Sequence, residues 1–138
     1  MYNTFYDFTV NINKLNRLFL QSIDLELKKN KIYDVNPNQA LLILNVSNNP
    51  RHVNDTHEGY WLGTNISYNI GDLVKKGYVT RIIDKQDLRC AFIGLTDKGM
   101  KLYNILEGVI MSRSKILHKM QIDVKKINEI LLSLQVIF

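Results

Sequence analysis

The residues with the clearest chemical potential lie in the segment 64–76. Side chains with amide and hydroxyl groups gather at its start, at Thr64, Asn65, Ser67, Tyr68 and Asn69. Such groups can form hydrogen bonds with base edges and with phosphate oxygens. Lys75 and Lys76 follow, and their ammonium groups suit phosphates better than bases. The residue types therefore indicate a binding surface for a polyanion.

Residues that could support other chemistry are scattered. The one cysteine, Cys90, cannot form a disulfide within a single chain, and a packing role is a simpler interpretation than a redox sensor. His52, His57 and His118 lack the spacing and partners of a metal site. The sequence shows no phosphate loop, nucleophile motif or dinucleotide fingerprint. We therefore expect no enzymatic activity, no cofactor and no metal.

Composition and charge fit a single globular domain with an anionic partner. The chain has 138 residues, of which 46% are hydrophobic and 22% charged, as in one globular domain. Its net charge of +5 favours nucleic acid or an anionic membrane as a partner. The N-terminal sequence lacks the features of a signal peptide, and no apolar run approaches the roughly 18–20 residues of a membrane span. We expect a cytoplasmic protein without a membrane segment.

The elements that would hold the polar segment can be read from periodicity. A helix over about 65–76 is expected to begin at an N-cap, Thr64, and to end at Gly77. Its apolar stripe is formed by Ile66, Ile70, Leu73 and Val74. Two β-rich runs, 78–83 and 90–95, are joined by a polar turn and predict a hairpin.

Five further helices are expected around these elements. A long amphipathic helix over about 7–29 has the stripe Ile12, Leu15, Leu18, Phe19 and Ile23. The apolar run 40–46 begins after a capping box of Asn36 and Gln39, with Pro37 between them. A short helix is expected over 52–58, and two more follow over 96–119, capped by Thr96, and 122–137.

This order predicts a mainly α protein with a small β-hairpin wing (an α+β fold), a winged helix-turn-helix. A helix fits the major groove of B-DNA, and a ribbon tip can reach the neighbouring minor groove. At the tip, Lys85 and Arg89 are positive, and Asp87 could orient Arg89. A solvated charged turn is the simpler alternative. Asp72 is unusual on a reading face, and an ion pair with Lys76 four residues later would explain it.

Residues 73–99, LVKKGYVTRIIDKQDLRCAFIGLTDKG, resemble the multiple-antibiotic-resistance regulator (MarR) family of bacterial transcription factors. GYWLGTNISYNI, residues 59–70, is similar to a subgroup of small winged-helix regulators. By this resemblance, Arg89 is the wing arginine with Asp87 as its partner, and residues 64–69 are the reading end of the helix. Leu88 stands where the family commonly has a second arginine.

The resemblance implies one MarR-like domain over 1–138, with a DNA-binding part at 33–95 and helical dimerisation parts at 5–30 and 96–138. The apolar ending 131–138 agrees with a homodimer, although it could instead fold back on the helix 96–119. The sequence thus predicts a dimeric, sequence-specific regulator that binds double-stranded DNA. A protein-binding module is the alternative, because residues 51–101 mix acids and bases. The operator, the direction of regulation, any effector and the pathway are not specified.

Overall fold

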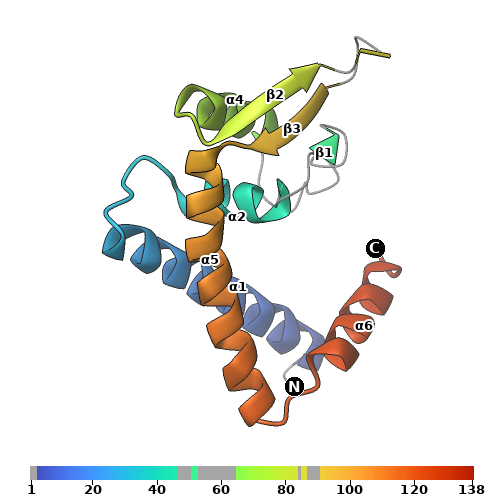
Figure 1. Cartoon of the computed structure of the whole chain (residues 1–138). Helices are drawn as coiled ribbons and strands as arrows, with labels where there is room; N and C mark the ends of the chain where they lie inside the picture. The colour runs from blue at the N-terminus through green and yellow to red at the C-terminus, as the bar shows by residue number, and fades with distance from the viewer. Residues whose placement is uncertain (1–2, 47–50, 53–64, 84, 87–90) are drawn as a thin grey trace. The chain divides into compact units, whose positions relative to one another are not determined.

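The structure is a computed structural model that describes residues 3–46, 51–52, 65–83, 85–86 and 91–138 (Figure 1). The chain forms two compact units, Met1–Leu106 and Glu107–Phe138, and each is described by itself. Thr64, Asp87, Arg89 and Cys90 lie outside the described residues, as does most of the expected helix over 52–58.

The first unit contains three helices, three strands and the beginning of a fourth helix. Its elements are α1 (Thr4–Lys29), α2 (Pro37–Val46), β1 (Arg51–His52), α4 (Ile66–Lys75), β2 (Val79–Ile83), β3 (Ala91–Leu95) and the first turns of α5 (Asp97–Lys119). The strands form an antiparallel sheet in the order β1-β3-β2, in which Arg81 pairs with Ile93. The fold is therefore the expected mainly α arrangement with a β wing.

The core of this unit is centred on α2. Ala40, Leu42, Ile43 and Val46 are buried, which explains why this helix is apolar on nearly every face. Buried side chains from the other elements pack around them, namely Ile23, Leu27, Ile70, Leu73, Ile93, Leu102 and Leu106. Since α4 and the sheet bury their side chains in the same core, the helix and the wing are held together.

The turn from α4 into β2 depends on Gly77. Its φ of 81° lies in the left-handed region, which a glycine adopts without a steric penalty. The next amide, that of Tyr78, donates to the carbonyl oxygen of Leu73 at 3.0 Å and so closes the helix end. The predicted stop at Gly77 is confirmed.

A second junction joins β3 to α5. The Thr96 hydroxyl accepts from the Gly99 amide at 3.1 Å, as the predicted N-cap requires, and also donates to the carbonyl oxygen of Gly77. Gly99 lies against the backbone of Tyr78, where an added Cβ would overlap the carbonyl oxygen. The Thr-x-x-Gly spacing thus packs the start of α5 on the exit of α4.

Several expectations about individual elements are corrected. His52 lies in β1, paired with Phe92, rather than in a helix, so the sheet has a third strand. Asn65, with an extended backbone, is the residue that precedes α4, and its side chain makes no capping bond among the described residues. Val74 is half-buried rather than part of the buried stripe.

The apolar stripe of α1 is only partly buried within the chain. Ile23 and Leu27 are fully covered, whereas Leu15 and Leu18 are 66% and 60% exposed. The difference divides α1 into a C-terminal part that completes the core and an N-terminal part that presents apolar side chains to solvent.

The second unit consists of the rest of α5 and α6 (Val124–Gln135). The side chain of Asp123 caps α6 by accepting from the Lys126 amide at 3.0 Å. All residues of α6 are described, and none of them is buried. Exposed side chains include Ile127, Ile130 and Phe138. A tail folded back on its own helix would bury this stripe, which these exposures do not show.

Candidate nucleic-acid interface

Helix α4 has one face in the core and one in solvent. Ile66, Ile70 and Leu73 are buried, as the stripe predicted. The predicted reading residues differ in exposure: Asn65, Ser67, Tyr68 and Lys75 are exposed, while Asn69 and Lys76 are half-buried. The amino-terminal half of α4 therefore presents an amide, a hydroxyl and a phenol to solvent, which suits hydrogen bonding in a groove.

Gln39 is the buried polar residue that connects α2 with α4, and sequence reasoning gave it only a local role. Its Oε1 accepts from the Asn36 amide at 3.1 Å, and Asn36 Oδ1 accepts from the Gln39 amide at 2.9 Å, which confirms the capping box. Its Nε2 then donates to Asp72 Oδ2 at 2.7 Å and to Asn69 Oδ1 at 3.5 Å. Gln39 is 2% exposed, whereas Asp72 and Asn69 are half-buried, so a buried donor meets two partly exposed acceptors.

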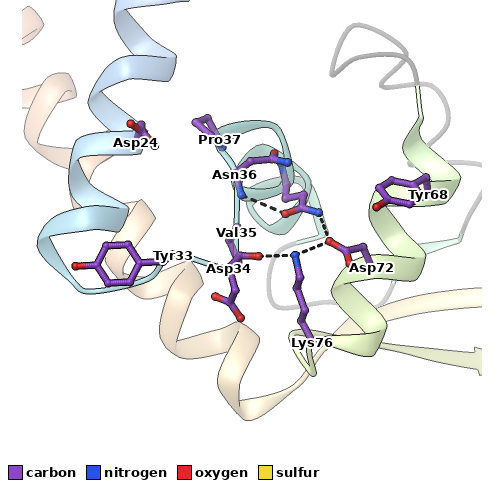
Figure 2. Close-up of a pocket in the computed structure, with 10 residues that line it drawn as sticks. Asp24, Tyr33, Asp34, Val35, Asn36, Pro37, Tyr68, Asp72 and Lys76 are labelled. Carbon is purple, nitrogen blue, oxygen red and sulfur yellow. Dashed lines mark hydrogen bonds and ion pairs between the residues drawn. The ribbon is translucent and has the colours of Figure 1, made fainter.

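Asp72 and Lys76 form the expected pair, but they do not form it alone. Lys76 Nζ lies 2.6 Å from Asp72 Oδ2 and also donates to the backbone oxygen of Asp34 at 2.6 Å (Figure 2). The bonds from Lys76 and then from Gln39 hold the pKa of Asp72 below its ordinary value. The Asp72 carboxylate thus points from α4 towards Gln39 of α2. Lys76 links the end of α4 to the segment before α2 through the Asp34 backbone.

A second polar group lies where α4 passes into β2. The Tyr78 hydroxyl donates to Asp34 Oδ1 at 2.8 Å. Burial, and then this bond, raise the pKa of Tyr78 to about 12. Lys98 lies over the Tyr78 ring at 4.3 Å from its centre and donates to the Lys76 carbonyl oxygen at 2.8 Å. Asp34 and Lys98 therefore brace the helix–wing junction from two sides.

An open cleft of about 450 Å³ lies between the segment before α2 and the face of α4 (Figure 2). Tyr33 and Tyr68 line it, together with the Asp72–Lys76 pair. Tyr33 is 75% exposed and Tyr68 is 69% exposed. The polar groups at its floor, Gln39, Asp72 and Lys76, are already bonded to one another. We therefore interpret the cleft as the exposed side of the hydrogen-bond network that joins α2 to α4.

The wing adds positive charge beside α4. Lys85 is exposed, as the sequence predicted. Arg81 is exposed on β2 as well and was not singled out from the sequence, because it lies before the polar turn. Ile82 and Ile83 are also exposed, at 46% and 65%. Lys75 of α4 and the two wing cations, Arg81 and Lys85, are thus three exposed positive charges among the described residues.

No other chemistry emerges from the part of the chain that the structure describes. Within it, no group of three His, Cys, Asp or Glu side chains is placed to hold a metal ion. Among its helices, none is long and apolar enough to cross a membrane.

Comparison with known proteins agrees with this geometry. Residues 35–99 match the model of a winged helix DNA-binding domain. The chain is 30% identical over 100 residues to the exopolysaccharide II synthesis transcriptional activator ExpG of Rhizobium meliloti (strain 1021). That match covers 72% of this chain and 52% of ExpG, so the chain spans about half the length of this relative.

Solved structures share the fold over nearly the whole chain. FabT of Streptococcus pneumoniae, in complex with DNA, is 14% identical with a TM-score of 0.77, and the match covers 97% of this chain and 99% of FabT. AbsC of Streptomyces coelicolor, a MarR family transcriptional regulator, is 16% identical with a TM-score of 0.71, covering 99% and 93%. At these identities the likeness establishes the fold.

Proposed function

We propose that this chain, a winged-helix protein with the fold of the MarR-family regulators, regulates transcription by binding double-stranded DNA as a homodimer. In this proposal α4 enters the major groove and the wing reaches the adjacent minor groove. The relatives with a stated role are transcription factors, and we propose a cytoplasmic role of the same kind rather than catalysis.

The observation that carries the proposal is the shared support of α4 and the wing. The polar end of α4 is exposed, while Ile70 and Leu73 anchor it in the core that also contains Ile93 of the sheet. A rigid pair of reading elements can contact two grooves at once without losing conformational entropy at either of them. Asn65, Ser67, Tyr68 and Asn69 are our candidates for base contacts, with Thr64 beside them.

Lys75, Lys85, Arg81 and Arg89 are our candidates for phosphate and minor-groove contacts, with Asp87 as the residue that orients Arg89. Lys76 was expected among them. Because its ammonium already donates to Asp72 and to the Asp34 backbone, we assign Lys76 first to bracing α4.

A second copy of the chain would cover the apolar surfaces that one copy leaves exposed. Leu15 and Leu18 of α1 and the stripe of α6, Ile127 and Ile130, lie in solvent in the single chain. Exposed apolar stripes of this kind are typical of subunit contacts. We therefore assign α1, α5 and α6 to dimerisation, as the family resemblance implied.

Selection of bound fragments from the source genome, followed by affinity measurements over a salt series, tests the function. We expect one recurring DNA sequence and a steep fall of affinity with salt, because each neutralised phosphate releases a counterion. Asn65→Ala is expected to alter base preference, whereas Lys75→Ala is expected to weaken binding to all sequences equally.

The contradicting outcome is also specific. If no fragment is enriched at low salt while a protein partner co-purifies in fixed stoichiometry, the chain is a protein-binding module built on the winged-helix fold. The mixture of acidic and basic residues over 51–101 would then be complementary to charges on that protein partner.

A further inference from the structure

The orientation of the Asn69 side-chain amide on α4 follows from its contact with Gln39 of α2. Gln39 is held at two ends by partners of opposite character. The Asn36 backbone amide can only donate, so Gln39 must turn Oε1 towards it. Asp72 is a carboxylate that can only accept, so Gln39 must turn Nε2 towards it. These two partners fix which way the buried amide points.

The second hydrogen of Gln39 Nε2 is directed at Asn69. The two groups are 3.5 Å apart, and Oδ1 is the only side-chain atom of Asn69 that can accept there. The reverse orientation of Asn69 would set two NH₂ groups against each other beside a buried donor. The oxygen of Asn69 is therefore turned towards α2, and its NH₂ group is turned the other way.

We propose that Asn69 presents only its NH₂ group to DNA, and that Gln39 is the positioning residue that imposes this. The inference rests on the proposed function of α4 in the major groove. A bidentate contact with adenine needs the oxygen and the NH₂ group of an asparagine to face the base together. With the oxygen facing α2, Asn69 selects base edges that accept, and guanine, with N7 and O6 side by side, is the best of them.

The test uses the full-length protein and a random library of DNA duplexes, from which bound sequences are selected and counted. Asn69→Ala first identifies the base pair that Asn69 contacts, as the position where preference is lost. At that position the unchanged protein is expected to prefer guanine by about tenfold over adenine and cytosine.

A charge-conserving exchange then reverses the amide. In the double variant Gln39→Glu/Asp72→Asn, the new carboxylate at position 39 still accepts from the Asn36 amide and completes the capping box. It also accepts from the new amide at position 72 and from Asn69, so the Asn69 side chain turns its oxygen towards the groove. Preference at the contacted base pair is expected to move to a base that donates, cytosine or adenine, by about tenfold. Asp72→Asn alone, which leaves Gln39 in place, is the matched control and should keep guanine.

Asn69→Asp is a second variant that keeps the core intact, because its carboxylate still accepts from Gln39. It offers acceptors only, so guanine should be lost and cytosine gained. Adenine preference in the unchanged protein, or a guanine preference that survives both the exchange and Asn69→Asp, would overturn the inference. Failure of the unchanged protein to select any sequence would instead overturn the proposed function. If a sequence is selected but the double variant keeps the same base preference, the role of Gln39 is wrong and the proposed function still holds.

Discussion

Around Gln39 and Asp72, polar side chains from distant parts of the first unit bond to one another, whereas along α6 apolar side chains lie open to solvent. Between α2 and α4 the polar side chains find their hydrogen-bond partners in the same chain: Gln39 is 2% exposed, and both its oxygen and its nitrogen are bonded. No residue of α6 is fully buried within one chain. The contrast indicates that the polar groups behind α4 find their partners within one copy of the chain, while the apolar side chains of α6 are left for a second copy to cover if the proposed dimer forms.

The largest expected effect comes from filling the close contact at the junction. In Gly99→Ala the new methyl group would overlap the Tyr78 carbonyl oxygen, and the start of α5 would have to move away from the turn between α4 and β2. We expect a loss of about 3 kcal/mol in the free energy of unfolding, measured by urea titration at constant protein concentration.

Gly108→Ala is the matched control on the same helix. A Cβ at this position meets no described atom within 4 Å, and alanine favours helix by up to about 1 kcal/mol. Equal destabilisation by the two substitutions would show that the junction is not the tightly packed region described above.

The next largest effect is expected at the exposed apolar stripe of α6. Ile130→Asp places a charge in the apolar stripe of α6, where the side chain is 51% exposed in one chain. If a second copy covers the stripe, burial of the charge should weaken dimerisation roughly hundredfold, about 3 kcal/mol. Sedimentation equilibrium measures the dissociation constant directly.

Asn128→Asp adds the same charge to α6 away from this stripe and should leave the dimer intact. A monomeric unchanged protein at micromolar concentration, or identical dissociation constants for the two variants, would show that α6 is exposed for another reason.

A smaller effect is expected at alkaline pH. The folded-state pKa of Tyr78, about 12, lies above the ordinary value of 10.0, so the neutral phenol stabilises the fold fully below pH 10. This stabilisation is lost as the pH rises through 12. Tyr78→Phe removes the bond to Asp34, should cost about 1 kcal/mol at neutral pH, and should make stability less dependent on pH between 10 and 12.

Stability measured over this pH range gives the comparison, with Tyr33→Phe as the control because that side chain is 75% exposed. The assignment fails if Tyr78→Phe retains the full loss of stability that the unchanged protein shows between pH 10 and 12.

The smallest effect distinguishes two lysines of the interface. Lys85→Ala removes an exposed cation of the wing and should lower the slope of log affinity against log salt by about 1. Lys76→Ala should change this slope less and destabilise the fold instead, because its ammonium is held by Asp72 and Asp34. The reverse pattern would make Lys76 the phosphate contact and Lys85 a bystander.

Local signals in the sequence were sufficient for much of the fold. Asn36-Pro37-Asn38-Gln39 predicted the start of α2, and Gly77 predicted the end of α4, because caps and stops depend on a few adjacent residues. The strand β1 was missed since two residues carry no alternation. The apolar part of α1 predicted a helix but not which of its residues the chain itself would cover.

The brace behind the interface was out of reach for a different reason. Asp72 looked misplaced on a reading face, and Gln39 is a polar residue at the head of an apolar run. Each is explained by the other, but they are separated by 33 positions and meet only after folding. A pair of such anomalies on neighbouring predicted helices was the available signal. Asp87 and Arg89 of the wing tip lie outside the described residues, and their roles stay predictions.

Footprinting on a selected duplex tests the central claim most directly. If each of two copies places α4 in a major groove, methylation protection should mark two major-groove segments about one helical turn apart, roughly 10 base pairs, or a multiple of it. Cleavage of the backbone should be reduced in the minor grooves beside them. Protection of a single segment, or of none, would contradict the account.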